Sequence, residues 1–128
     1  MANPMPELGD AELEVLKALW DAGPGTVRQV LAHLHERKRR LAYTTVLTVL
    51  TRLEQKGYVS SDKSGLAYLY RAKISRQRVT ASRVKAMVEQ LYDGAAGQLA
   101  LQLVKGERLT AAEIDELQKL IERLDRDE

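Results

Sequence analysis

The 128-residue chain contains no cysteine and no phenylalanine, and it has only three prolines and one tryptophan. Without cysteine it has no disulfide framework, no thiolate nucleophile and no cysteine-ligated zinc site. No apolar run approaches the roughly 20 residues that a membrane-spanning helix requires. Residues 1–10 also lack the basic flank and apolar core of an export signal. These absences predict a cytoplasmic protein that is neither exported nor inserted into a membrane.

Features that would support catalysis or cofactor binding are missing as well. The chain has no glycine-rich phosphate loop, no nucleophile motif and no paired carboxylates beyond ordinary acidic helix faces. His33 and His35 lie two residues apart, so they point to different faces of a helix and are poorly placed to share a metal ion. We therefore expect no enzyme activity, no cofactor and no metal site, and we interpret the two histidines as surface or packing residues.

Charge is unevenly distributed, although the formal net charge is only +2. Residues 1–23 contain one Lys or Arg against five Asp or Glu, residues 24–78 contain twelve against three, and residues 79–128 contain seven against ten. The middle part thus carries +9, between flanks of −4 and −3. A basic domain between acidic neighbours is typical of proteins that bind a polyanion, although a basic face can also be merely solvated.

Apolar periodicity in the first half predicts three helices. They are expected over residues 11–20, 26–40 and 43–56. Asp10 is the expected N-cap of the first helix. Thr26 and Gln29 have the spacing of a capping box, and Gly57 can take the left-handed conformation that often ends a helix.

Two short strands rich in Tyr, Val and Leu are expected next, over residues 58–61 and 67–72, with a polar turn between them. Three helices followed by a hairpin is the element order of a winged helix-turn-helix, in which the third helix enters the DNA major groove and the hairpin is the wing. We therefore predict a mainly α fold with a small β-hairpin, in which residues 1–74 form the winged-helix DNA-binding domain.

The third predicted helix can divide into an apolar inner face and a hydroxylated outer face. Val46, Val49, Leu50 and Leu53 share the inner side, and the remaining surface carries threonines and Arg52. Hydroxyls can bond phosphates or base edges, threonine methyls can touch thymine, and arginine can pair with phosphate or guanine. The predicted DNA-binding residues are Arg28, Arg39, Arg40, Tyr43, Thr44, Thr45, Thr48, Thr51, Arg52, Lys63 and Arg71.

The basic run at residues 37–40 is the densest in the chain and is interpreted as a phosphate clamp that leads into the third helix. Lys63, at the tip of the wing, and Arg71, on its second strand, are further candidates for phosphate contacts. The alternative for the threonines and for the basic run is an exposed, solvated surface without a ligand. The order of the surrounding elements favours DNA binding.

Residues 75–128 are predicted to form a helical dimerisation domain. Helices are expected over residues 76–92, 95–104 and from 110 to the C-terminus, where Thr110 and Glu113 make a second capping box. Their apolar seams exceed what a small winged helix can bury, so we expect a second copy of the chain to cover them, unless the helices fold back within one chain. The predicted dimerisation residues are Val84, Met87, Val88, Leu91, Leu99, Leu103, Ile114, Leu117, Leu120, Ile121 and Leu124.

Several segments together resemble the BlaI/MecI family of penicillinase repressors. They read LGDAELEVLKALW, TVRQVLAHL, AYTTVLTVLTRLEQKGYV, AYLYRA and LTAAEIDEL. The stretch over residues 42–59 is the most specific, because other winged helices share the architecture without this run of threonines. The resemblance implies a homodimer that occupies a palindromic double-stranded DNA operator and represses transcription. It also implies derepression by a membrane metallopeptidase sensor that cuts the C-terminal domain.

Alignment on LTAAEIDEL places that possible cleavage site at Gln102-Leu103, where the family pattern has Asn and Phe. Neither residue matches, so the sequence leaves open whether the chain is cut and whether its inducing signal is a β-lactam. Two other readings remain alongside the repressor. One is a winged helix that docks a protein partner, and the other is a winged-helix regulator that responds to a small ligand. The operator sequence and the regulated genes are not encoded in these patterns.

Overall fold

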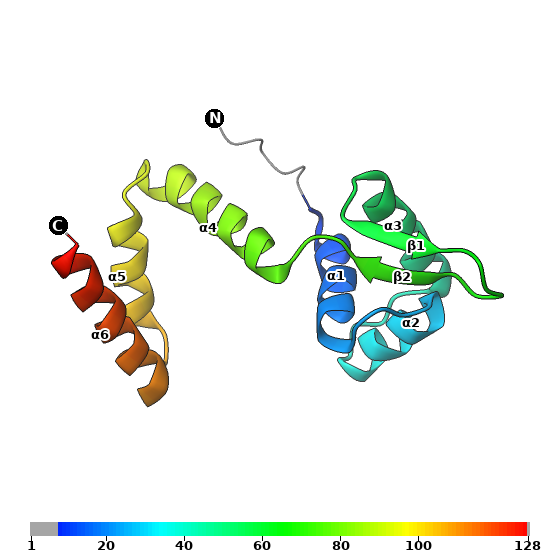
Figure 1. Ribbon diagram of the computed structural model, residues 1–128, viewed down its shortest axis with the longest axis horizontal. Helices are drawn as coiled ribbons and strands as arrows, with labels where there is room; N and C mark the ends of the chain where they lie inside the picture. The colour runs from blue at the N-terminus through cyan, green and yellow to red at the C-terminus, as the bar shows by residue number, and fades with distance from the viewer. Residues whose placement is uncertain (1–7, 128) are drawn as a thin grey trace. The chain divides into compact units, whose positions relative to one another are not determined.

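The computed structural model describes residues 8–127, so most of the N-terminal segment inspected above for an export signal lies outside the described part. Its elements are α1 (Asp10–Ala22), α2 (Val27–Glu36), α3 (Tyr43–Gln55), β1 (Val59–Asp62), β2 (Leu69–Ala72), α4 (Arg76–Tyr92), α5 (Ala96–Gly106) and α6 (Ala111–Arg126) (Figure 1). The predicted fold class is confirmed, because three helices and an antiparallel hairpin are followed by helices alone.

Two predicted capping boxes are present. The Gln29 amide donates to Thr26 Oγ1 at 3.2 Å, and the Thr26 amide donates to Gln29 Oε1 at 2.8 Å. Thr110 and Glu113 make the same reciprocal pair at 2.9 and 3.1 Å. Each box satisfies backbone donors that the first turn of a helix leaves unpaired. The starts of α2 and α6 are therefore fixed by local sequence.

The predicted N-cap of the first helix was wrong. Asp10 already lies inside α1, and Gly9 holds the capping position. Glu12 reaches back to accept a hydrogen bond from the Gly9 amide, with 2.9 Å between the two atoms. Because Glu12 supplies the acceptor from the third helical position, the helix begins one residue earlier than an Asp10 cap would allow.

The end of α3 is a Schellman motif centred on Gly57. This glycine has φ of +83°, and its amide donates to the Glu54 carbonyl at 3.0 Å while the Tyr58 amide donates to the Leu53 carbonyl at 2.9 Å. The two bonds satisfy the last carbonyls of the helix and turn the chain directly into β1. Gly57 thus couples the predicted recognition helix to the hairpin.

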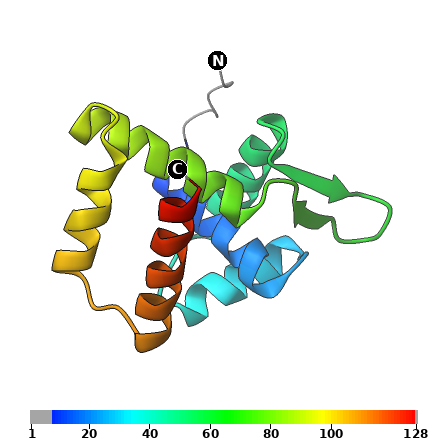
Figure 2. The ribbon, with the colours of Figure 1, turned by 60° about the vertical axis from the view of Figure 1, so that its left-hand side comes forward.

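One hydrophobic core joins the first three helices and the hairpin, which come together in both ribbon views (Figures 1 and 2). Leu16, Leu34, Val46, Leu50 and Leu53 expose at most 1% of their surface. Burial of such side chains contributes about 1.5–3 kcal/mol each, so this core holds α3 against α1 and α2. The helix is a rigid base for its outward side chains.

The hairpin pairs Val59 with Ala72 and Ser60 with Arg71 in antiparallel register. A third segment joins it, because the Gly25 amide donates to the Tyr70 carbonyl at 2.9 Å and the Tyr70 amide donates back at 2.8 Å. The turn before α2 therefore covers one edge of β2. This pairing fixes the base of the wing and leaves its turn to project (Figure 2).

The start of α4 is anchored on the same core. Trp20 Nε1 donates to the Ile74 carbonyl at 2.9 Å, and Ile74 and Val79 are both buried in the core cluster. Contacts divide the chain into two compact units, of which the first ends at Arg83 and the second begins at Val84. This division lies later than the predicted one after residue 74, because the first turns of α4 continue the winged-helix core.

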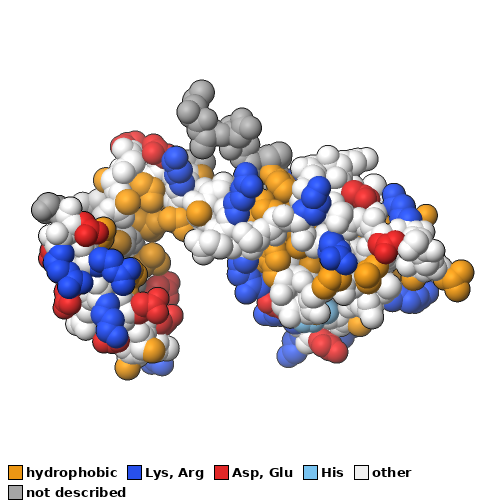
Figure 3. Space-filling view, viewed as in Figure 1, with side chains coloured by type: hydrophobic (Ala, Val, Ile, Leu, Met, Phe, Trp, Pro, Cys, Tyr) orange, Lys and Arg blue, Asp and Glu red, His pale blue; other side chains and the backbone are white. Residues whose placement is uncertain are grey.

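The second unit contains the rest of α4 with α5 and α6. None of the residues of α5 or α6 is buried, and the extensive contacts between elements all belong to the first unit. Hydrophobic side chains lie open on the surface of this helical unit (Figure 3). No helix among the residues described is both long enough and apolar enough to cross a membrane.

Candidate nucleic-acid interface

The two faces of α3 differ as the sequence predicts. Val46, Val49, Leu50 and Leu53 are buried, exposing no more than 4% of their surface. The residues predicted to face DNA are all exposed, and they are Tyr43, Thr44, Thr45, Thr48, Thr51 and Arg52. The structure therefore assembles these six side chains on the outer surface of one helix, whose inner surface is fixed by the core.

Leu47 also lies on this outer face, and sequence reasoning missed it. It is 38% exposed, whereas Val46 beside it is fully buried. The signal was its spacing, because Leu47 stands three residues after Thr44 and four before Thr51, on the same side of a helix. A leucine among outward threonines makes the surface more apolar than its threonines alone suggest.

Two threonine hydroxyls on this face donate to the backbone of their own helix. Thr48 Oγ1 donates to the Thr44 carbonyl and Thr51 Oγ1 donates to the Leu47 carbonyl, each at 2.9 Å. A hydroxyl has one proton, so each side chain keeps its oxygen lone pairs and its methyl group for other contacts. With these two bonds in place, Thr48 and Thr51 can accept hydrogen bonds and present methyl groups to a ligand, but they have no free hydroxyl proton to donate.

The N-terminal end of α3 is flanked by an arginine from α2. The Arg28 guanidinium lies over the Tyr43 ring, 5.3 Å from its centroid, and both side chains are exposed. Stacking on the ring orients Arg28 without neutralising its charge. Cation and helix N-terminus together form a surface suited to a phosphate group.

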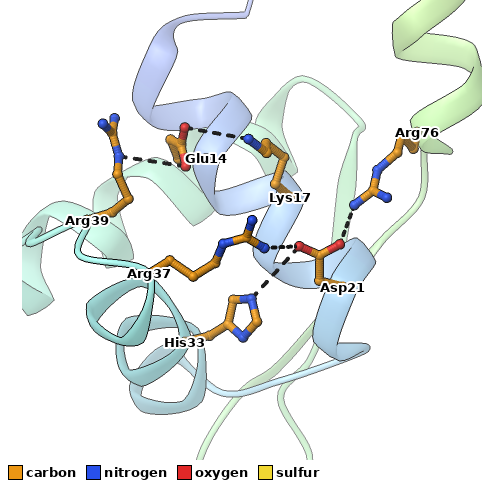
Figure 4. A network of polar contacts seen from close by, with 7 residues as sticks. All are labelled: Glu14, Lys17, Asp21, His33, Arg37, Arg39 and Arg76. Carbon is orange, nitrogen blue, oxygen red and sulfur yellow. Dashed lines mark hydrogen bonds and ion pairs between the residues drawn. The ribbon is translucent and has the colours of Figure 1, made fainter. Parts of the chain in front are cut away.

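The basic run between α2 and α3 is partly engaged by α1 (Figure 4). Arg37 donates to Asp21 Oδ2 at 2.6 Å, and Arg39 Nε lies 3.7 Å from Glu14 Oε2. Both arginine side chains remain more than half exposed. Arg40 is exposed next to the start of α3. Of the four cations in the predicted clamp, Arg37 and Arg39 are thus oriented by acidic residues of α1, and Lys38 and Arg40 are exposed to solvent.

Asp21 is the meeting point of three side chains (Figure 4). It accepts hydrogen bonds from Arg76 and Arg37, and His33 Nε2 lies 4.0 Å from its Oδ2. The hydrogen bond from Arg76, with the nearby positive charges, holds the pKa of Asp21 below its usual value despite some desolvation. One carboxylate therefore joins the end of α1 to the basic run and to the start of α4.

The wing carries both of its predicted cations on the outside. Lys63 lies over the Tyr68 ring at 5.6 Å from the centroid, and Arg71 is exposed on β2. The turn is ordered by Asp62, which accepts hydrogen bonds from the Ser64 amide at 2.9 Å and hydroxyl at 2.6 Å, bonds that lower the pKa of the carboxyl. Leu66 extends fully into solvent at the tip.

The two histidines serve separate contacts. His33 is half-buried and faces Asp21, whereas a ring nitrogen of exposed His35 lies 3.1 Å from the Leu41 carbonyl. Across residues 8–127 no group of three or more potential metal ligands lies together. The His33 ring therefore packs against the end of α1, and the His35 ring contacts the loop between α2 and α3.

These features define the class of the protein. A winged helix that presents a hydroxylated third helix, flanked by exposed arginines on α2 and on its wing, is the architecture of DNA-binding transcription regulators. A family model described as penicillinase repressor matches residues 8–123. The chain belongs to the penicillinase repressor family, whose members are DNA-binding transcriptional repressors and not enzymes.

Individual relatives agree over nearly the whole chain. The transcriptional regulator BlaI of Mycobacterium tuberculosis is 38% identical over 119 residues, which are 92% of this chain and 85% of that protein. The penicillinase repressor of Bacillus licheniformis is 26% identical over 118 residues, which are 92% and 91% of the two chains. The solution structure of the DNA-binding domain of the repressor BlaI matches 59% of this chain and 90% of that one, with 29% identity and a TM-score of 0.50.

Proposed function

We propose that two copies of this chain bind one palindromic DNA operator in the cytoplasm and thereby repress transcription. In this proposal α3 of each copy enters the major groove of one half-site, and the wing and the cations around α3 contact the phosphate backbone. The observation that carries it is the two-sided α3, whose core face is fully packed while its outer face is exposed and flanked by Arg28, Arg40 and Arg52.

The phosphate contacts are proposed for cations that surround α3 from several elements. Arg28 comes from α2, Arg39 and Arg40 from the loop before α3, and Lys63 and Arg71 from the wing. Each phosphate that a cation neutralises releases a bound counterion. This release makes the slope of log affinity against log salt concentration steeper by about one. A protein that uses several of these residues must therefore lose affinity sharply as salt increases.

Dimerisation is proposed for the second unit because most of its apolar side chains are not covered by the helices of that unit. Nine of the eleven predicted dimerisation residues expose between 37% and 68% of their surface. The other two are Val88, which is buried, and Leu99, which is half-buried. Exposed apolar seams of this extent mark an interaction surface. A second copy of the chain would cover the apolar seam, and it would also supply a second α3 for the other half-site of a palindromic operator.

The experiment that tests the repressor function compares the full chain with a chain that ends at Tyr92, on a palindromic duplex selected by the full protein from a random library. We expect the shortened chain, which keeps the winged-helix core, to bind the palindrome at least about a hundredfold more weakly, because it loses the second binding event. Equal affinity of the two chains would contradict the proposal.

The switch is proposed to act on α5, which carries Gln102 and Leu103, both exposed. A protease takes its substrate as an extended strand, so α5 must unwind locally before it is cut. A cut there separates α6 and its seam from the rest of the chain. Replacing the segment around residues 102 and 103 with the recognition sequence of a commercial protease tests this step. Cutting is expected to release the operator, and continued tight binding would contradict the switch.

A membrane metallopeptidase sensor, which the family resemblance implies, is the proposed partner that makes this cut. Incubating the protein with membranes of its own cells, before and after β-lactam treatment, shows whether a fragment ending near residue 102 is produced.

A protein-docking winged helix is the second candidate, and the basic middle segment of +9 is the observation that favours it. The two candidates differ in their binding to a random duplex as salt increases. A DNA-binding protein shows measurable affinity with a steep slope, whereas a docking module shows little affinity and a shallow slope.

A further inference from the structure

We propose that Leu47, together with the methyl groups of Thr48 and Thr51, reads the 5-methyl groups of thymines in the major groove. The inference rests on the proposed function, because it takes α3 as the helix that enters the groove. It adds the chemistry that the helix recognises, and it makes Leu47 a specificity-determining residue.

The first observation is the position of Leu47 within the exposed face. Thr44, Leu47, Thr48 and Thr51 follow one another at spacings of three, one and three residues, which places them on one stripe of the helix. Leu47 is 38% exposed at the middle of this stripe. The core already has its own leucines on the opposite face, so Leu47 is not needed to complete it.

The second observation is the use of the hydroxyl protons. Thr48 and Thr51 each donate their only hydroxyl proton to a carbonyl of their own helix at 2.9 Å. To donate to a base or a phosphate, either side chain would first have to give up that bond. While the bonds persist, the stripe presents methyl groups and oxygen lone pairs around an aliphatic side chain.

The third step is the chemistry of the groove. Among the base edges of the major groove, thymine alone presents a methyl group, and all others present donors or acceptors. Leu47 pressed against such a donor or acceptor would leave it without water and without a partner, which is costly. Against a thymine methyl it buries apolar surface instead. The stripe therefore favours half-sites with thymine on either strand where the middle of α3 lies.

The test uses the full-length protein and the duplex that it enriches from a random library. Each thymine of the half-site is replaced in turn by deoxyuridine, which removes the methyl and keeps the base pair. We expect the wild-type protein to lose about fourfold in affinity for each methyl that it contacts. The Leu47→Ala protein is expected to show little or no thymine preference at the position that Leu47 contacts. Thr48→Val keeps a methyl and removes the hydroxyl, so it tests whether the hydroxyl contributes, and a thymine preference is still expected. Arg126→Ala on α6 is the control outside the DNA surface, and it should leave the preference unchanged.

Each outcome decides a separate question. Equal affinity for thymine and deoxyuridine at every position overturns the inference and leaves the repressor function intact. A full thymine preference in Leu47→Ala, or loss of operator binding in Thr48→Val, also overturns it, because either result assigns recognition to other groups or to the hydroxyl. Failure to enrich any duplex overturns the proposed function together with the inference. The wild-type measurement on deoxyuridine duplexes needs no substitution, so it holds even where a variant folds poorly.

Discussion

Replacing Gly57 with alanine should destabilise the winged helix by a predictable amount. Gly57 has φ of +83°, and a Cβ added there would meet no atom within 4 Å. The cost is therefore conformational rather than steric, and a left-handed alanine costs about 1–2 kcal/mol. Alanine also reduces the freedom of the unfolded chain, which returns about 0.4–1 kcal/mol. We expect a net loss of about 1 kcal/mol in the free energy of unfolding.

Urea titration followed by tryptophan fluorescence measures this loss. Trp20 is the one tryptophan of the chain, and its indole bond to the Ile74 carbonyl makes it a reporter of the winged-helix core. The urea concentration at the unfolding midpoint should fall, while the slope of the free energy of unfolding against urea concentration stays unchanged. The melting temperature should drop by about 4–8 °C for each kcal/mol lost.

Gly65→Ala is the matched control in the turn of the wing. The φ of Gly65 lies outside the left-handed region, and its added Cβ would meet only the Ala67 carbonyl oxygen at an ordinary 3.6 Å. We expect this change to alter stability by less than about 0.5 kcal/mol. The account of the Schellman motif is refuted if Gly57→Ala unfolds at the wild-type midpoint, or if both variants lose the same free energy.

Three further predictions address charge, dimerisation and acidity. Arg40→Ala should weaken binding to operator and random duplexes alike and reduce the slope of log affinity against log salt concentration by about one. Arg126→Ala on α6 should change neither the affinity nor the slope. An unchanged slope in Arg40→Ala would show that Arg40 does not contact a phosphate. Ile121→Asp should shift the protein toward the monomer in sedimentation experiments, with Arg126→Ala as a control of equal charge change, and a stable Ile121→Asp dimer would move the interface away from α6. The pKa of Glu12 lies below its ordinary value of 4.5, because the Gly9 amide and Lys56 together outweigh the burial that would raise it. Its stabilising contribution is thus present above about pH 4.5 and lost as pH falls below that. Urea midpoints of wild type and Glu12→Gln should differ above pH 4.5 and converge in acid, and a constant difference would contradict this.

Local patterns were sufficient for the predicted order of elements and for most of α3. Capping boxes at Thr26 and Thr110 involve residues three apart, so sequence spacing shows them directly. The apolar period of α3 identified its buried side correctly, because a helix packed on a core has to place its large aliphatic groups inward. The left-handed end at Gly57 also follows from residue type.

Features that depend on contacts between distant segments were not predictable in this way. Asp21 meets Arg37 and Arg76 only because α1, α2 and the start of α4 pack together, and no spacing along the chain indicates this. The bridge from Gly25 to Tyr70 has the same origin. Leu47 was missed for a different reason: it was assigned to neither face of the predicted helix, although its spacing from Thr44 and Thr51 places it on the outer face.

The number of chains on one operator tests the central claim most directly. The full-length protein is titrated against a duplex with both half-sites and against a duplex with a single half-site. Sedimentation gives the number of chains bound to each duplex, and fluorescence anisotropy gives the affinity. The account predicts two chains on the palindrome and affinity lower by at least about a hundredfold on the single half-site. One chain per duplex with equal affinity for both would contradict a dimeric repressor that reads DNA through α3.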